Sequence, residues 1–275
     1  MELEKNELTK YILPYKQNHN WGLKNKNYHK KFASKEILYY LPEILKYNHN
    51  RYTHITPKIL DLGCGAGPMA FAHKLTFEPE TKKEIDFVGI DINQQAIDFL
   101  KKAYPKNYYF HLHQGNDNIN YIGKNLKGDN NNTLSHSDGN ECDFKIGFEF
   151  KSDIQWSSSF FTHLTPNGCD KSLNFIKNNL SQDGYSFNSW LLIDPLSKAS
   201  LKIGASDRKL NYDYGEYMSY SKENPLVCSA YKIDFVEKIY DKNELEIVSI
   251  LRGSWRGGEK NTFNHYQDII VSKLK

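Results

Sequence analysis

Cysteine is scarce in this 275-residue chain, and its four cysteines are scattered along the sequence at Cys64, Cys142, Cys169 and Cys228. The absence of a Cys-x-x-Cys pair argues against a zinc ribbon and against a disulfide framework. Residues 1–10 are charged throughout and lack the apolar segment of a secretion signal. No apolar run approaches the roughly 20 residues that span a bilayer. We therefore expect a cytoplasmic protein in a reducing environment, with no membrane span.

A strong excess of charge of either sign is also lacking. The formal net charge is +3 at pH 7, which is too balanced to predict nucleic-acid binding. The lysines of residues 24–31 are interpreted as a solvated helix face rather than a phosphate groove. Hydrophobic residues make up 39% and charged residues 25% of the chain, so we expect a globular protein with one large domain or two small ones.

The most informative part of the sequence is residues 58–68, which read Lys-Ile-Leu-Asp-Leu-Gly-Cys-Gly-Ala-Gly-Pro. The short apolar run predicts a buried strand. Three glycines at alternate positions, Gly63, Gly65 and Gly67, predict a tight turn in which the backbone comes very close to a ligand. The helix after such a turn directs free N–H groups at that ligand. The pattern therefore predicts a ligand seat, with a tight turn that binds nothing as the alternative.

A second apolar run ends in an acid. Residues 87–91 read Phe-Val-Gly-Ile-Asp, and a carboxylate at the end of the second strand, here Asp91, can accept hydrogen bonds from ribose hydroxyls. The dinucleotide fingerprint Gly-x-Gly-x-x-Gly fails, because Pro68 stands at its sixth position. Strand, glycine turn, helix, strand and acid together predict the nucleoside-binding half of an α/β fold.

The run Asp61-Leu-Gly-Cys-Gly-Ala-Gly67 resembles the first motif of the class I S-adenosylmethionine-dependent methyltransferases, Asp/Glu-x-Gly-x-Gly-x-Gly, and Asp91 matches that family's second acidic motif. The resemblance implies a Rossmann-like α/β fold, with a seven-stranded, mostly parallel sheet, an antiparallel last strand and helices on both faces. It also implies that the cofactor S-adenosylmethionine lies over the carboxyl ends of the first two strands, as the general rule for open α/β sheets requires.

Later segments resemble one branch of this family, which is found beside bacterial glycan-building enzymes. The branch's Ser-x-Phe-Thr-His-Leu segment matches residues 159–164, and its Asn-x-x-Tyr segment matches residues 118–121. Its terminal Gly-x-Trp-x-Gly and Tyr-Gln-Asp segments match residues 253–257 and 266–268. The likeness therefore extends over roughly residues 57–275.

The resemblance also implies a set of cofactor-binding residues. The glycine loop is expected to cradle the methionyl part of the cofactor, and Asp91 to bind its ribose. Asp61 is expected to orient the loop or meet the cofactor's amino group, or else only to brace the loop. The third-strand motif departs from the family's acid, so that Asn116 or Asp117 is left to meet the adenine amine. The predicted set is Asp61, Gly63, Cys64, Gly65, Gly67, Asp91, Ile92, Asn116, Asp117 and Trp156.

Two residues are candidates for catalysis. An alcohol acceptor needs a base or a metal at neutral pH, and His163, just after the fourth strand, has an ordinary pKa near 6.5 that suits a base. Its alternative role is to brace the next helix. Asp268 is a second candidate base or substrate ligand, with a salt bridge or strand-end cap as the alternative. Tyr231, Trp255 and Arg256 are expected to line the substrate site, unless the aromatic rings belong to the core. No metal site is predicted.

The chain is expected to divide into an N-terminal helical and aromatic segment, residues 1–50, and a methyltransferase domain, residues 51–275. Apolar residues at helical spacing predict one helix in the first segment, over residues 33–46. Residues 124–143 lack periodicity and are interpreted as a mobile surface insertion. Residues 195–230 are interpreted as an irregular segment, too long for an ordinary connection, that covers the substrate site.

Capping and turn signals predict the remaining elements. Asn93 is a predicted helix N-cap, and Thr165-Pro166 supplies the N-cap and first residue of another helix. Asp234 begins a further helix with a pattern like a capping box. The other expected elements are strands over residues 108–113 and near 154–155, a turn at 182–184, a strand over 189–193, and an antiparallel pair over 246–251 and 266–272.

Three functions are compatible with these features. The first is an S-adenosylmethionine-dependent O-methyltransferase for a sugar, either nucleotide-linked or part of a surface polysaccharide such as a capsule. The second is a methyltransferase for an amine or a phosphate-type oxygen, and the third is a module that binds the nucleoside without chemistry. The Asn-Pro-Pro-Tyr motif used on nucleic-acid bases is absent after the fourth strand. The expected partner is therefore a small molecule or glycan, and no nucleic acid.

Overall fold

A computed structural model describes residues 10–11, 41, 43–48, 56–76, 85–113, 144–257 and 265–275. They belong to two compact units, Met1–Gln114 and Gly115–Lys275. Of the helix predicted over residues 33–46, residues 41 and 43–45 are described and α-helical. Several predictions lie outside the described residues, namely those for the lysines of 24–31, Asn116, Asp117, residues 118–121 and residues 124–143. The predicted division into residues 1–50 and 51–275 stays a prediction.

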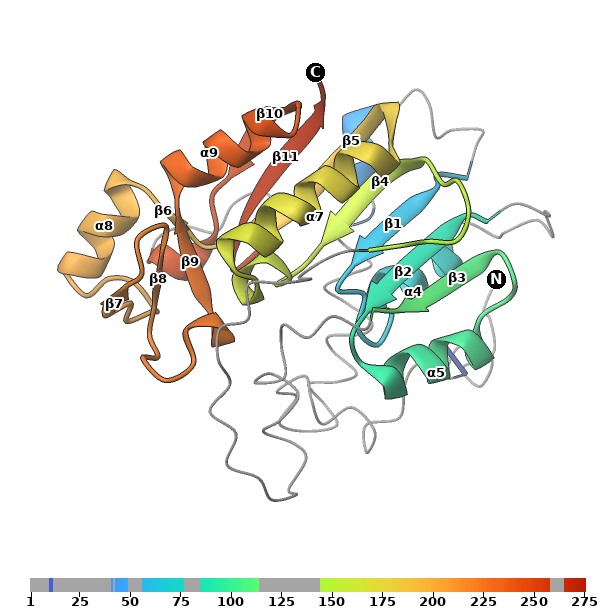
Figure 1. The fold of residues 1–275 in the computed structure, drawn as a ribbon, viewed down its shortest axis with the longest axis horizontal. Coiled ribbons are helices and arrows are strands. Elements are labelled where there is room, and N and C mark those ends of the chain that lie inside the picture. The colour runs from blue at the N-terminus through green and yellow to red at the C-terminus, as the bar shows by residue number, and fades with distance from the viewer. Residues whose placement is uncertain are drawn as a thin grey trace. The chain divides into compact units, whose positions relative to one another are not determined.

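Parallel strands form the centre of the N-terminal unit (Figure 1). Strand β2 pairs in parallel with β1 on one side and with β3 on the other. A helix follows each of the first two strands, as the sequence predicts. The bounds are β1 (Ile59–Leu62), α4 (Pro68–Thr76), β2 (Phe87–Asp91), α5 (Gln94–Ala103) and β3 (Tyr108–Leu112).

The core of this unit is apolar and aromatic. Every residue of β1 is buried, which suits a central parallel strand covered on both faces. His73 of α4 is also fully buried, with Nδ1 2.7 Å from the Tyr108 hydroxyl and Nε2 3.1 Å from the Pro57 carbonyl oxygen. Burial lowers the pKa of His73 to about 4, so the imidazole is neutral at pH 7 and packs as a core residue.

The C-terminal unit supplies the mixed part of the sheet. Strands β4 (Ser152–Ser157) and β5 (Leu180–Trp190) are parallel, whereas β11 (Asp268–Leu274) runs antiparallel to β5 and to β10 (Leu245–Leu251). The hydrogen-bonding order of all seven strands is β10-β11-β5-β4-β1-β2-β3. This order confirms the predicted α/β fold class, a seven-stranded sheet whose last strand is antiparallel.

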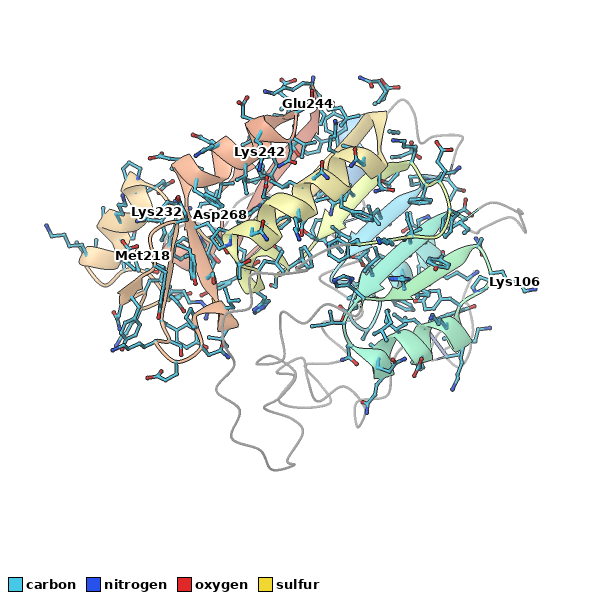
Figure 2. The ribbon with its side chains drawn as sticks, in the orientation of Figure 1. Lys106, Met218, Lys232, Lys242, Glu244 and Asp268 are labelled. Atoms are coloured by element: carbon cyan, nitrogen blue, oxygen red, sulfur yellow. The ribbon has the colours of Figure 1, made fainter. Side chains whose placement is uncertain are left out.

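Helices α7 (Pro166–Asn179) and α9 (Ile233–Lys242) lie side by side along the strands of this unit (Figure 1). Asp170 of α7 accepts hydrogen bonds from Lys242 and Asn243 at the end of α9. Figure 2 labels Lys242 on α9. Because the lysine is exposed, this ion pair contributes little to stability. The helices of the described residues include none with the length and apolarity needed to cross a membrane.

Two predictions between α7 and the next strand are wrong. Residues 182–184 form no turn, and the single strand predicted over 189–193 is divided between the end of β5, which covers residues 180–190, and a separate short strand over residues 192–193. The register between β4 and β5 shifts across this part, because the strand bulges there. A Cβ on Gly184 would come within 2.9 Å of the Ser152 carbonyl oxygen. The glycine therefore permits a close approach of two strands. Because Asp183 and Gly184 are residue types common in turns, the sequence predicts a turn here.

The expectation of an irregular segment over residues 195–230 is also wrong. The segment holds helix α8 (Pro195–Lys202) and most of a second, four-stranded sheet in the order β6-β9-β8-β7. The strands are two to four residues long, too short for periodicity to be recognised. Their bounds are β6 (Leu192–Ile193), β7 (Tyr212–Asp213), β8 (Tyr217–Ser219) and β9 (Ser229–Lys232). The predicted covering of a substrate site stays a prediction.

The predictions of helix starts are partly confirmed. The Asn93 side chain accepts from Ala96 N and the Thr165 side chain from Gly168 N, so both predicted N-caps are confirmed. The capping box predicted from Asp234 is wrong, because α9 begins one residue earlier with Lys232 as an N-cap that makes no side-chain bond. A true capping box that sequence reasoning missed lies at Asp194, which caps α8 together with Ser197.

Candidate functional site

The turn between β1 and α4 has the backbone that its glycines predict. Gly63, Gly65 and Gly67 have φ angles of 72°, 49° and 78°, in the left-handed region that other residues rarely adopt. The N–H groups of Gly63 and Cys64 donate to the Ile90 carbonyl oxygen at 2.8 and 3.0 Å, which ties the turn to the end of β2. Helix α4 begins at Pro68, whose missing N–H costs nothing at this position.

Asp91 holds the same turn through its side chain. Its Oδ2 accepts from the backbone N–H of Gly65 at 2.7 Å, and its Oδ1 accepts from that of Asn93 at 2.8 Å. Burial raises the pKa of Asp91, although the backbone N–H donors oppose that rise. The side chain is only partly buried, as is Ile92 beside it. The predicted ribose ligand thus lies directly against the glycine turn.

A second carboxyl, Asp61, lies inside β1. It is almost fully buried, and burial together with the negative charge of Asp91 raises its pKa well above the ordinary range. A cation placed beside both carboxyls would relieve their repulsion and favour their ionised forms. Two carboxyls, a bare backbone turn and a helix N-terminus fit a ligand that carries positive charge and sugar hydroxyls, as S-adenosylmethionine does.

Packing beneath the turn leaves no space for added side chains. A Cβ on Gly67 would lie 2.5 Å from Leu100 Cδ2, and one on Gly89 would lie 3.0 Å from the Cys64 sulfur. Burial raises the pKa of the Cys64 thiol well above its ordinary value, so the thiol is protonated at neutral pH. Cys64 can therefore offer a ligand its backbone, while its side chain fills the core.

Replacing Gly67 with alanine is expected to cost about 1–3 kcal/mol of unfolding free energy, because the positive φ is strained for alanine and Leu100 must move. Urea denaturation measures this cost. Gly204→Ala is the matched control, since Gly204 has a similar φ of 71° but nothing within 4 Å of its added Cβ. Equal costs for the two variants would show that close packing under the turn is unimportant.

His163, the candidate base, lies in the C-terminal unit within the single turn η6 (Phe161–His163). Its Nδ1 is 3.1 Å from the Leu226 carbonyl oxygen. A carbonyl only accepts, so Nδ1 carries the proton and the neutral ring has its lone pair on Nε2. Burial lowers the pKa of His163 from its ordinary 6.5, and the charge of Arg208 lowers it further. The imidazole is therefore neutral at pH 7, the form that can accept a proton.

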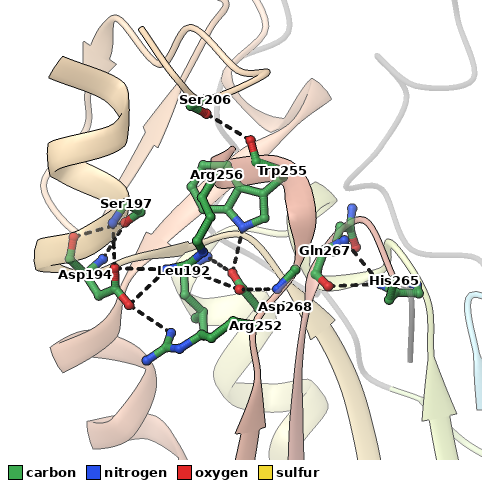
Figure 3. Close-up of polar contacts among 11 residues, drawn as sticks. Leu192, Asp194, Ser197, Ser206, Arg252, Trp255, Arg256, His265, Gln267 and Asp268 are labelled. Carbon is green, nitrogen blue, oxygen red and sulfur yellow. Dashed lines mark hydrogen bonds and ion pairs between the residues drawn. The ribbon is translucent and has the colours of Figure 1, made fainter. Parts of the chain in front are cut away.

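Asp268, the second candidate base, is fully buried in a polar cluster that Figure 3 shows. Its Oδ1 accepts from Gly253 N at 2.8 Å and from Arg256 Nη2 at 2.6 Å. Its Oδ2 accepts from Leu192 N at 2.9 Å and from Trp255 Nε1 at 2.8 Å. A carboxylate with four donors and no exposed surface has no oxygen available to a substrate. The geometry therefore favours the salt-bridge alternative over the base.

The predicted substrate-lining residues are buried as well. Trp255 and Tyr231 have no exposed surface, and Arg256 is 4% exposed. Arg256 bridges two carboxylates, with Nη1 3.1 Å from Asp194 and Nη2 2.6 Å from Asp268. These contacts favour a core role for the two aromatic rings and a structural ion pair for Arg256. Sequence reasoning missed Asp194, although its Asp-Pro-x-Ser pattern is a recognisable helix start.

Trp156, the remaining predicted cofactor ligand, lies in β4 and is 4% exposed. Its ring meets His265 edge to face, with the centroids 6.4 Å apart. Within the ranges that the structure describes, no cluster of three or more His, Cys, Asp and Glu side chains has the arrangement of a metal site. The structure thus brings together the predicted cofactor residues of the N-terminal unit, and separately His163, Arg208 and Leu226 in the C-terminal unit.

No protein-family model matches the chain, but solved structures do. DesVI from Streptomyces venezuelae matches with a TM-score of 0.54 and 13% identity, covering 96% of this chain and 99% of that one. A S-adenosylmethionine-dependent methyltransferase from Clostridium acetobutylicum matches with a TM-score of 0.50 and 13% identity, covering 89% and 91%. Magnesium protoporphyrin IX methyltransferase (ChlM) from Synechocystis PCC 6803, solved with bound SAH, matches at 0.50 and 12%, covering 98% and 95%.

At these identities the likeness establishes the fold. The chain has the Rossmann-like fold of the class I S-adenosylmethionine-dependent methyltransferases. The predicted branch of glycan-modifying enzymes rests on the sequence segments alone.

Proposed function

We propose that the protein is an S-adenosylmethionine-dependent methyltransferase that methylates a hydroxyl group of a sugar, nucleotide-linked or part of a surface polysaccharide. The observation that carries the proposal is the turn at residues 63–67, where three left-handed glycines face an acid that ends β2. The fold shared with methyltransferases of known structure supports the same reading.

The N-terminal unit supplies the cofactor seat in this proposal. The bound cofactor brings an already activated methyl group, so the protein's task is to bind, align and exclude water. The glycine turn lets the methionyl part lie against the main chain. Asp91 accepts hydrogen bonds from the ribose, and Asp61 adds negative charge that complements the cofactor's cationic groups.

The C-terminal unit supplies the base. A sugar hydroxyl is too weak an acid to react at pH 7 unless a neighbouring group takes its proton. His163 is neutral at that pH, and its Nδ1–H bond to Leu226 fixes the ring with the lone pair on Nε2. We propose that Nε2 accepts the proton of a sugar hydroxyl.

Replacing His163 with glutamine is expected to lower kcat for a hydroxyl acceptor by about 10²–10⁴-fold, the usual contribution of a general base. Transfer from labelled S-adenosylmethionine to a panel of nucleotide sugars and glycans measures the effect. Unchanged binding of S-adenosylhomocysteine by the variant is the control for folding. A fully active variant would favour an amine or phosphate-type acceptor instead.

The sugar assignment has a separate test in the same panel. Methyl transfer to a small amine or another acceptor class, with none to any sugar, would reject the substrate while keeping the enzyme. Binding of the cofactor without turnover on the panel or on any cell extract would favour a nucleoside-binding module.

A further inference from the structure

Three arginines lie in the part of the chain that the structure describes, and one of them differs from the others. Arg252 lies 2.9 Å from an Asp194 carboxylate oxygen. Arg256 bridges Asp194 and Asp268. Arg208 forms no ion pair with any carboxylate of the described residues, and its side chain is hydrogen-bonded to Tyr266 instead. Its Nε is buried without a hydrogen bond there, as are Arg252 Nη1 and Arg256 Nε. A positive charge without a carboxylate partner is thus held in the C-terminal unit.

The position of Arg208 is fixed by its neighbours. Its own N–H donates to Ser206 Oγ at 3.1 Å, and that hydroxyl donates to the Trp255 carbonyl oxygen at 3.0 Å. The Asp207 N–H donates to the same carbonyl at 2.9 Å. The guanidinium carbon lies 5.2 Å from the centroid of the Tyr266 ring. The backbone bonds therefore fix the main chain at Arg208, and the contacts with Tyr266 hold its guanidinium group.

Packing links Arg208 to the segment that holds the candidate base. The guanidinium lies over the Tyr266 ring, and Tyr266 packs against the apolar cluster that contains Cys228. The charge of Arg208 also contributes to the lowered pKa of His163. His163 is tied to Leu226 of the turn η7 (Pro225–Val227), which leads into Cys228. Arg208 and His163 are thus connected through the same short segment, η7 and Cys228, of the C-terminal unit.

We propose that Arg208 binds an anionic group of the acceptor, a phosphate or a sugar carboxylate, and so holds the acceptor beside His163. The inference rests on the proposed function and names its substrate class, an acidic or phosphate-bearing sugar. Guanidinium suits this role because its planar fork donates two parallel hydrogen bonds to either anion. An anion would also satisfy the buried Nε and neutralise a charge that the protein leaves without a carboxylate.

Calorimetry with two probes tests the inference on the full-length protein. Pyrophosphate represents the nucleotide-sugar source of the anion, and glucuronate represents the carboxylate source. At least one probe is expected to bind, and Arg208→Gln is expected to weaken it about tenfold or more, in keeping with the strength of charge-assisted pairs. Lys209→Gln is the matched control, because this adjacent lysine is exposed and carries the same charge.

Each outcome decides the inference. Binding of neither probe to the wild type, or equal weakening in both variants, overturns it. A second measurement does not depend on a variant: the bound probe should raise the pKa of His163 in NMR titration, because a nearby anion favours imidazolium. An unchanged His163 pKa at saturation would place the anion elsewhere and overturn the inference.

Binding of S-adenosylhomocysteine, measured in parallel, separates this inference from the proposed function. A wild type that binds pyrophosphate through Arg208 but not S-adenosylhomocysteine would reject the methyltransferase and leave the anion site. A wild type that binds S-adenosylhomocysteine, with probe binding indifferent to Arg208, would reject the anion site alone.

Discussion

Replacing Asp268 with alanine is expected to lower the free energy of unfolding by about 3–5 kcal/mol, the cost of breaking a buried ion pair on one side. The loss would leave Arg256 facing only Asp194, and would orphan the donors of Trp255 and two backbone N–H groups inside the protein (Figure 3). Urea denaturation followed by circular dichroism measures the change.

Asp241→Ala is the control for this experiment. Asp241 also pairs with a cation, Lys275, but its side chain is 78% exposed, so its loss should cost well under about 1 kcal/mol. An Asp268→Ala protein with undiminished stability and no turnover would restore the catalytic role that the sequence suggested for this residue.

Replacing Asp91 with asparagine is expected to weaken binding of S-adenosylhomocysteine by about 10–100-fold, since hydrogen bonds to a charged group contribute about 1.5–3 kcal/mol each. The amide would retain one acceptor oxygen, but its NH₂ would face a backbone donor, either that of Gly65 or that of Asn93. The substitution would therefore weaken the hydrogen bonds that hold the glycine turn and would also remove a carboxylate oxygen that we propose accepts from the ribose. Calorimetry measures the affinity.

Asp98→Asn serves as the comparison, because Asp98 is an exposed residue of α5 whose bonding partner within the helix is Gln94. Its affinity for S-adenosylhomocysteine should equal that of the wild type. An Asp91→Asn affinity within threefold of wild type would remove Asp91 from the cofactor site.

The glycine turn of the N-terminal unit, which we propose as the cofactor seat, was predictable because its signals are local. Alternate glycines, an apolar run before them and an acid after the next strand each leave a direct mark on the sequence. The backbone at Gly63, Gly65 and Gly67 has the left-handed angles that such a pattern requires. The adenine contacts expected from Asn116 and Asp117 stay predictions.

The C-terminal unit was harder to predict because its decisive contacts are distant in sequence. The sequence indicates Asp268 as a candidate base or substrate ligand, but its partners Arg256 and Leu192 lie 12 and 76 residues away. A single acid in a sequence has the same appearance whether it faces a substrate or four internal donors. Burial, which separates those cases, depends on the assembled fold.

The two C-terminal sequence motifs prove to be one structural feature. The backbone of Trp255 donates to the Tyr266 carbonyl oxygen at 3.0 Å, and Gly253 donates to Asp268 at 2.8 Å. A Cβ on Gly253 would lie 2.3 Å from the Gln267 carbonyl carbon, so only glycine allows the two segments to approach so closely. Their joint appearance in the sequence therefore reflects contact, which was not visible from their spacing.

One carboxylate thereby fastens three separate stretches of chain: the start of β6, the turn near Trp255 and the first residue of β11. Chimeras that exchange residues 192–257 between related scaffolds should fold only when the terminal strand is transplanted with them. In circular permutants opened between the turn and that strand, Asp268 and its partners near Trp255 would lie at opposite ends of the polypeptide and would still have to meet for the protein to fold.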